Sequence, residues 1–168
     1  MSHILTECQG TGQLLIWSLA RDLLSRKGYA LPQPSLGLIL GCGLNAASPG
    51  RPIPGIGRLY TIVISESAHL IWKLRCRWRI QCEGRPHDIP SPQEVQNKWT
   101  ATMQSRLKFD ALLTDKMRYG QKALSKRTVL LTWKNTLLGE DTLPADWTNL
   151  PGVLVGMARE RRPPGRNR

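Results

Sequence analysis

The sequence predicts an all-α fold: an irregular helical domain of about four helices, with long Gly/Pro loops and a disordered basic C-terminal tail. Apolar residues recur at three- and four-residue spacing in several segments, which is typical of helices that bury one face. Clusters of Gly and Pro separate these segments, and both residues interrupt regular structure. The chain has 168 residues, of which 40% are hydrophobic. These values suit a single domain, which we expect over residues 13–156.

The first long helix is predicted over residues 13–27. Thr11 is the predicted N-cap, and Gly28 is the predicted C-terminal stop. Arg26 and Lys27 would lie in the last turn, where the helix dipole favours cations. One apolar face supports the helix: Leu15, Ile16, Leu19, Leu23 and Leu24.

The next segments are shorter or more ambiguous. Residues 36–40 are apolar and fit either a strand or one helical turn. Residues 41–57 are rich in Gly and Pro and are predicted to form a long loop without regular elements. Such a loop is uncommon inside a compact domain unless it has a function.

Residues 59–83 fit two periodicities. Leu59, Val63, Leu70 and Leu74 follow helical spacing, whereas apolar and polar residues alternate over residues 72–82. No helix-breaking residue occurs in this segment, and a strand of that length is rare. We therefore predict one long helix, and a strand from residue 72 remains the alternative.

Two more helices are predicted after a linker at residues 83–90. Ser91-Pro92-Gln93-Glu94 resembles a capping box with Pro at the first helical position, and this helix should run to about Leu113. A shorter helix opens at Leu124 or Ser125 and should end at Gly139. Its predicted apolar face comprises Val129, Leu130, Trp133 and Leu137, and residues 145–156 are expected to be mostly irregular.

Charge and composition limit the function classes. The net charge is +12 with a pI near 10.2, which favours an anionic partner, most commonly nucleic acid. No apolar run approaches the roughly 18 residues of a membrane span. The N-terminus lacks the pattern of a secretory signal, and four scattered Cys do not form a disulfide framework. We expect an intracellular, reduced protein without a membrane partner.

Basic residues interleaved with Trp are the main functional signal. Lys and Arg neutralise phosphates without sequence preference, so we expect weak, non-specific binding of RNA or DNA. The equally weighted alternative is a solvated basic face with Trp in the core. Residues 157–168 form the predicted disordered tail, in which residues 159–168 carry five Arg and one Glu. The predicted contacts are Lys73, Arg75, Arg77, Arg79, Lys98, Arg106, Lys122, Lys126, Arg127, Arg161 and Arg162.

No catalytic or cofactor motif has its required context. Gly41–Ala46 fits G-x-G-x-x-A, but Pro49 follows and no βαβ unit is visible, so a glycine turn is the better interpretation. Ser65, Ser67 and His69 have no local nucleophile signature. The acids are dispersed, and Glu140-Asp141 fits a solvated turn rather than a two-metal site. We expect neither enzymatic activity nor a cofactor.

Two His/Cys pairs carry metal-ligand chemistry. His3 and Cys8 form H-x4-C, but tetrahedral zinc closure takes four ligands. His69 and Cys76 are seven residues apart and would share one helix face. Without further ligands, we interpret His69 and Cys76 as packed core residues.

Several separated phrases resemble a known family. HILTEC, the phrase from Ile16 to Leu44, SESAHLIWKLRCRWRI, LLTDKMRYGQKAL and LPADWTNLPGVLVG are similar to the C-terminal region of fungal non-LTR-retrotransposon-like proteins. That region lies around and after the reverse-transcriptase zinc-binding domain and its RNase H neighbour. The resemblance covers most of residues 3–156, and the Arg-rich tail falls outside it.

The resemblance carries expectations about metal and function. The family's zinc motif looks like C-x2-C followed by H-x4-C, and His3 and Cys8 match its second half. With two ligands missing, residues 1–12 look like a motif remnant in an N-terminally truncated element copy. Zinc would then bind only if the missing ligands came from elsewhere.

The resemblance implies a non-catalytic, retroelement-derived region associated with RNA or DNA. Two alternatives remain open. The chain is either a helical protein–protein interaction module of a larger reverse-transcriptase polyprotein or a decayed fragment without function.

Overall fold

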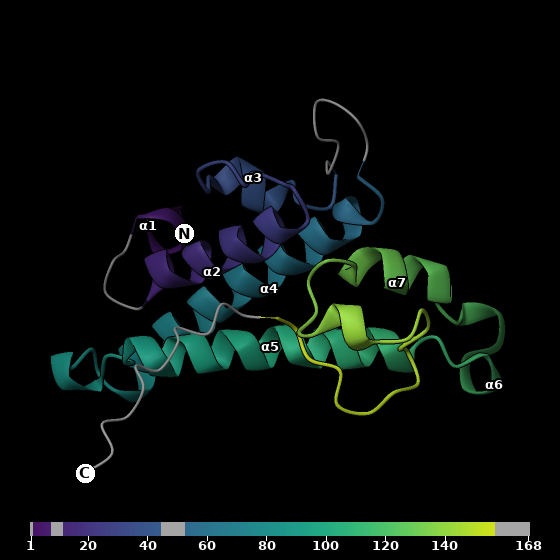
Figure 1. Cartoon of the computed structure of the whole chain (residues 1–168). Helices are drawn as coiled ribbons and strands as arrows, with labels where there is room; N and C mark the ends of the chain where they lie inside the picture. Colours follow the sequence, from purple (N-terminus) through teal and green to yellow (C-terminus); the bar gives the residue numbers. More distant parts are fainter. Residues whose placement is uncertain (1, 8–11, 45–52, 157–168) are drawn as a thin grey trace, which may run out of the picture.

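The computed structural model describes residues 2–7, 12–44 and 53–156, and these residues form the predicted all-α fold (Figure 1). Within those ranges there is no strand, only an isolated antiparallel bridge between Leu137 and Val155. Four described α-helices have eight or more residues, as the sequence predicts, and three have five or fewer. The α-helices are α1 Ser2–Thr6, α2 Gln13–Arg26, α3 Leu36–Leu40, α4 Ile56–Cys76, α5 Pro92–Leu112, α6 Lys116–Tyr119 and α7 Lys126–Trp133.

Short non-α turns complete the helical elements. The π-helix η2 follows α4, and three-residue 3-10 helices lie in the connections. Neither α6 nor η4 contains a buried residue. These elements are η2 Arg77–Gln81, η3 Pro86–Asp88, η4 Gly120–Lys122 and η5 Glu140–Thr142.

Helix α2 confirms the first predicted helix with different ends. Thr11 lies outside the described residues, and Gly12, with φ 76°, occupies the N-cap position. The backbone amides of Lys27 and Gly28 donate to the carbonyls of Leu24 and Ser25 and end the helix. Most of the predicted apolar face is buried, whereas Leu15 is only half-buried.

Residues 36–40 form a helical turn rather than a strand. The Ser35 side chain caps this turn, since its Oγ accepts a hydrogen bond from the Leu38 amide at 3.2 Å. The predicted loop over 41–57 is wrong at its end, because α4 already begins at Ile56. Residues 45–52 of that loop lie outside the described residues.

The long helix predicted over 59–83 is confirmed, and the strand alternative is wrong. Residues 72–76 belong to α4, and 77–81 continue as the π-helix η2. The alternating apolar residues do not share a face: Leu74 is buried, whereas Trp72 is 40% and Ile80 75% exposed. The alternating segment is therefore helical throughout residues 72–81 and not an extended chain.

Helix α5 begins at the predicted cap, but only half of the capping box forms. Ser91 Oγ accepts a hydrogen bond from the Glu94 amide at 3.2 Å. The Glu94 side chain does not reach back to the Ser91 amide as predicted, because it binds Arg77 and Lys98 instead. The helix ends at Leu112, one residue before the predicted end.

Helix α7 is shorter than predicted. It ends at Trp133 rather than near Gly139, because Lys134 leaves the helical conformation with a ψ of 136° and Asn135 follows with a positive φ of 67°. Leu137 is buried, but it belongs to the bridged segment after the helix. The final segment is irregular as predicted, and Gln104 of α5 binds the backbone of Val153 and Val155 at 2.7 and 2.9 Å.

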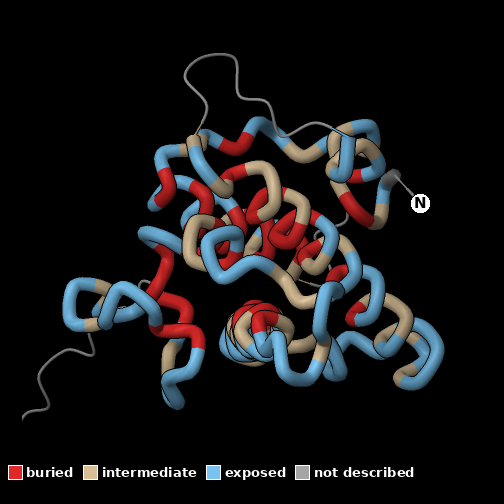
Figure 2. The backbone as a smooth tube through the Cα atoms, turned by 90° about the vertical axis from the view of Figure 1, so that its right-hand side faces the viewer, coloured by how far each residue is buried: buried red, intermediate tan, exposed pale blue. Residues whose placement is uncertain are grey.

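The core lies where α2, α4 and α5 face one another, with α7 over the end of α5 (Figures 1 and 2). Four of the six Trp are buried in it: Trp17, Trp99, Trp133 and Trp147. Trp99 Nε1 donates a hydrogen bond to Ser67 Oγ at 2.9 Å, which satisfies its polar atom between α4 and α5.

A buried polar cluster joins α4, α5 and α7. Arg58 donates to both carboxylate oxygens of Asp110, at 2.5 and 2.6 Å. Trp133 Nε1 donates to Asp110 Oδ2 at 2.8 Å. The Asp110 side chain is fully buried, whereas that of Arg58 is 28% exposed. The cluster therefore fixes the relative position of three helices through one carboxylate.

Lys27 does not direct its side chain to the C-terminal end of its own helix, α2, where the sequence predicts it. Its side chain is buried and crosses to the C-terminal end of α7, where Nζ donates to the carbonyls of Leu131 and Lys134 at 2.5 and 3.2 Å. Burial, with a smaller effect of Lys134, lowers the pKa of Lys27 to about 8, although Glu140 opposes the shift. Lys27 therefore caps α7 rather than its own helix.

We expect stability to rise with pH between about 8 and 10.5, the folded pKa of Lys27 and its ordinary value. In this window the unfolded chain binds more protons at Lys27 than the folded chain does, so the free energy of unfolding increases with pH. Urea unfolding at several pH values measures this slope. Because the other titrating groups are unchanged in Lys27→Met, the difference between the two proteins isolates the Lys27 contribution. Equal slopes in both proteins would contradict this account.

None of the helices in the described ranges combines the length and the apolar character that a membrane crossing requires.

Candidate functional site

Three of the predicted nucleic-acid contacts, Arg77, Lys98 and Lys126, lie at opposite ends of α5. Arg77 and Lys98 meet at Glu94, in the first turns of the helix. Lys126 pairs with Asp146 at 2.7 Å beside the C-terminal end of the helix. A helix of 21 residues spans about 30 Å, so the predicted residues do not form one continuous surface.

A groove lies between α4–η2 and the first half of α5, and we call it the α4–α5 groove. Its volume is about 770 Å³. Trp72 and Ile80 give it an exposed apolar lining. The lining residues are His69, Leu70, Trp72, Lys73, Leu74, Cys76, Arg77, Ile80, Gln81, Lys98, Ala101 and Thr102.

Three cations lie around this groove. Lys73 is exposed and has no ion-pair partner within the described part of the chain. Arg77 and Lys98 share Glu94 Oε1, at 3.1 and 2.5 Å. The hydrogen bond from Lys98, reinforced by Arg77, lowers the pKa of Glu94 and keeps it ionised. Three positive charges against one negative charge leave the groove cationic.

Trp78 lies between two of the predicted arginines. The guanidinium carbons of Arg75 and Arg79 lie 5.1 and 5.6 Å from the centroid of its ring. Trp78 Nε1 donates to the Arg85 carbonyl at 2.8 Å and fixes the ring on the turn after η2. Arg75 and Arg79 are therefore engaged in cation–π contacts, and replacing them would affect packing as well as charge.

The remaining predicted cations lie further along the molecule. Arg106 Nε lies 3.3 Å from Glu66 Oε1, and its guanidinium is 5.8 Å from the Phe109 ring centroid. Lys122 and Arg127 are exposed on η4 and α7. Arg161 and Arg162 lie outside the described residues.

The residues considered for catalysis in the sequence analysis form hydrogen bonds within the fold. Ser67 Oγ accepts from Trp99, and Ser65 Oγ donates to the Ile62 carbonyl at 3.2 Å. Glu140 accepts hydrogen bonds from the amides of Asn135 and Leu137, which fits the turn interpretation.

The glycine motif forms a turn at residues 41–44, where the Cys42 carbonyl accepts from Thr61 Oγ1 at 2.8 Å. Asn45 and Ala46 lie outside the described residues.

The two His/Cys pairs considered as metal ligands do not form a metal site among the described residues. His3 Nδ1 lies 3.2 Å from Glu7 Oε2 on the surface, and Cys8 is outside the described residues. Among the residues that the structure describes, no three His, Cys, Asp or Glu side chains cluster as metal ligands would. The interpretation of His69 and Cys76 as packed core residues is wrong, because His69 is exposed, Cys76 is half-buried and both line the α4–α5 groove.

Two features of the structure are not predictable from the sequence alone. Trp72 cannot be told from the core Trp residues by type or spacing, and only the structure shows that it is exposed. In the sequence, Asp110 looks like one of the dispersed acidic residues, because its partner Arg58 lies 52 residues earlier in the chain.

Comparisons of the chain with protein-family models, curated proteins and solved structures found no match.

Proposed function

We propose that the α4–α5 groove binds single-stranded RNA or DNA with little sequence preference, in a non-catalytic region derived from a retroelement. One observation carries the proposal: a partly exposed Trp72 lies in a groove flanked by Lys73, Arg77 and Lys98. Proteins that bind single strands combine aromatic side chains, on which bases stack, with cations that follow the phosphates.

The groove supplies both parts of this recognition. A base would stack on the exposed part of the Trp72 ring and lie against the Ile80 side chain. Lys73 is free to meet a phosphate, and Arg77 can turn from Glu94 because its side chain is 55% exposed. These contacts read no base edge, so affinity would follow strand charge and stacking rather than sequence.

The resemblance of several phrases within residues 3–156 to retrotransposon-like proteins also favours a nucleic-acid partner. The distant cations would contribute little to binding in the groove, because charges more than about 8 Å apart are largely screened at physiological salt. Four described cations do not line the groove: Arg106, Lys122, Lys126 and Arg127. Arg161 and Arg162 lie outside the described residues.

We expect labelled oligo(dT) and random-sequence RNA to bind with a Kd on the order of 10⁻⁴–10⁻⁶ M at physiological salt. Trp72→Ala should weaken binding by about 1–3 kcal/mol, the usual effect of one stacked base. Trp72→Phe keeps an aromatic ring and should retain most of the affinity. Fluorescence anisotropy with a salt titration measures both effects.

Two lysines provide a matched test of location. Lys73→Glu should weaken binding, whereas Lys116→Glu makes the same charge change near the other end of α5 and should have a much smaller effect. Equal losses in both variants would place the contact outside the groove. If protein that is folded by circular dichroism binds no oligonucleotide at low salt, the protein-interaction alternative replaces this proposal.

A further inference from the structure

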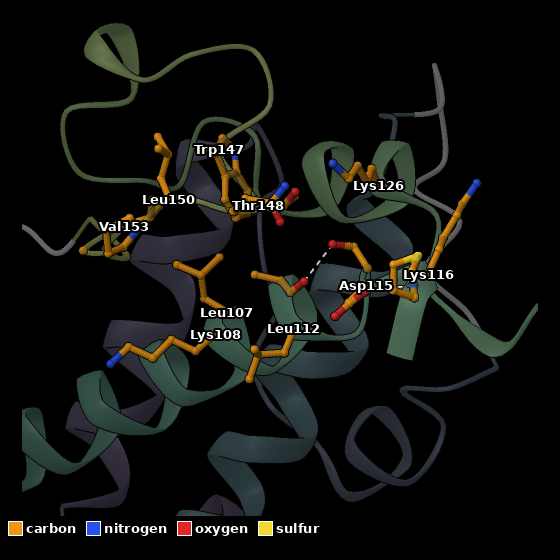
Figure 3. A pocket seen from close by; sticks show the side chains of 16 residues that line it. Leu107, Lys108, Leu112, Asp115, Lys116, Lys126, Trp147, Thr148, Leu150 and Val153 are labelled. Carbon is orange, nitrogen blue, oxygen red and sulfur yellow. Dashed lines mark hydrogen bonds between the residues drawn. The ribbon is translucent and has the colours of Figure 1, made fainter. Parts of the chain in front are cut away.

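A second groove lies at the opposite end of α5, and we call it the α5–α7 groove (Figure 3). Its volume is also about 770 Å³. In Figure 3, Trp147, Leu150 and Val153 of the irregular C-terminal segment face Leu107 and Leu112 of α5 across the opening. Gln104 ties this segment to α5 through the Val153 carbonyl, so one wall of the groove is anchored.

The lining of the groove is largely apolar and remains open to solvent. Trp147 is buried, whereas Leu112 is 60% and Met117 98% exposed. Leu150 is also exposed. Exposed apolar side chains that continue from a groove onto the surface are typical of interaction sites.

The charges around the α5–α7 groove favour an anionic occupant. Lys108, Lys116 and Lys126 come from α5, α6 and α7 and line the groove together (Figure 3). Lys126 pairs with Asp146, but Lys108 and Lys116 have no ion-pair partner in the described ranges.

Both nearby carboxylates are already engaged. Asp115 accepts from the amides of Met117 and Arg118, at 2.9 and 3.2 Å. Asp146 accepts from Lys126 and from Thr148, and the hydrogen bond from Lys126, with those from Thr148, lowers the pKa of Asp146 to about 2. Within the described residues, neither carboxylate forms an ion pair with Lys108 or Lys116.

We propose that the α5–α7 groove binds an acidic peptide segment of another protein, whose apolar side chains enter the groove while its carboxylates meet Lys108 and Lys116. Charge complementarity and the apolar lining together select this partner. This inference does not rest on the proposed nucleic-acid function, because it concerns different residues at the other end of α5.

The lining favours a peptide over other anions. A nucleic-acid strand would meet mainly aliphatic side chains here, since Trp147 is buried and no aromatic ring in the lining is exposed. A peptide can place several apolar and acidic side chains along the groove at once.

The test uses the full chain as bait for a phage library of random peptides of about twelve residues, a length that fits groove recognition. We expect enriched peptides to combine Asp or Glu with Leu, Ile or Phe. Fluorescence anisotropy of one enriched peptide then compares variants that are checked for folding by circular dichroism. Leu150→Glu and Lys116→Glu should each lower its affinity about tenfold or more through charge repulsion in the groove.

Matched controls make the same chemical changes elsewhere. Leu40→Glu replaces an exposed leucine on α3, and Lys73→Glu replaces a lysine of the α4–α5 groove; both should leave peptide affinity within about twofold. No enrichment over uncoated wells, enrichment of basic peptides, or equal losses in groove and control variants would each overturn the proposal. If Leu150→Glu weakens oligonucleotide binding and no peptide is enriched, the groove belongs to nucleic acid instead.

Discussion

Replacing Arg58 with methionine is expected to lower the free energy of unfolding by about 3–5 kcal/mol, which is the usual cost of leaving one partner of a buried ion pair. Asp110 is fully buried, and Arg58 donates to both of its oxygens. Without the guanidinium, Trp133 Nε1 is the only side-chain donor to Asp110 that remains among the residues the structure describes. Urea unfolding followed by far-ultraviolet circular dichroism measures the change.

Replacing the other partner, Asp110, should lower the free energy of unfolding by less. Asp110→Asn is expected to lower the free energy of unfolding by only about 1–3 kcal/mol, because the partly exposed Arg58 can reach water and the amide oxygen can still accept from Trp133. The double variant, Arg58→Met with Asp110→Asn, should be more stable than Arg58→Met alone, since no unpaired buried charge remains. An equal or smaller loss for Arg58→Met than for Asp110→Asn would contradict this account.

The second large effect is expected at Gly55, the N-cap of α4. Its φ is 75°, and an added Cβ would lie 2.2 Å from the Leu131 carbonyl oxygen. Gly55→Ala should lower the free energy of unfolding by about 2–5 kcal/mol, the sum of a left-handed alanine and an overpacked contact. The Leu131 carbonyl cannot withdraw freely, because it also accepts from Lys27.

Gly152 provides the matched control for this substitution. Its φ is 80°, but nothing lies within 4 Å of an added Cβ. Gly152→Ala should therefore cost only the conformational term of about 1–2 kcal/mol. Thermal and urea unfolding of both variants separates the two contributions. If the two variants lose equal stability, the close approach of α4 to α7 at Gly55 has no energetic weight.

The sequence predicts the long helices because their signals are local. The leucine spacing of residues 13–27 and the Ser91 cap act within a few residues, and both features appear in the structure. The errors arise where a distant group competes for the same atom. Glu94 leaves the capping box because Lys98 and Arg77 bind its carboxylate, and Arg77 lies 17 residues away.

The candidate site is less predictable than the fold for the same reason. Alternating charges locate Lys73 and Arg77 near Trp72, but they do not show which Trp is buried. In the sequence, Lys126 looks like Lys98, because both belong to the basic residues interleaved with Trp. In the structure, Lys98 pairs with Glu94 in the first half of α5, whereas Lys126 lies on α7 and pairs with Asp146. The exposure of a side chain and the separation of two charges depend on how α4, α5 and α7 pack, and periodicity does not encode this packing.

The segment from Asp115 to Lys122 contains α6 and η4 and has no buried residue, in contrast to the helices on either side. A hydrogen bond from the Leu124 amide to the Leu113 carbonyl, at 2.8 Å, closes its base. Because little apolar contact is lost when such a segment opens, its amides should exchange with solvent through local openings that leave the rest of the fold intact. We therefore expect Lys116 and Met117 to open together with this segment, so that part of the α5–α7 groove lining could adjust to an occupant while the core stays folded.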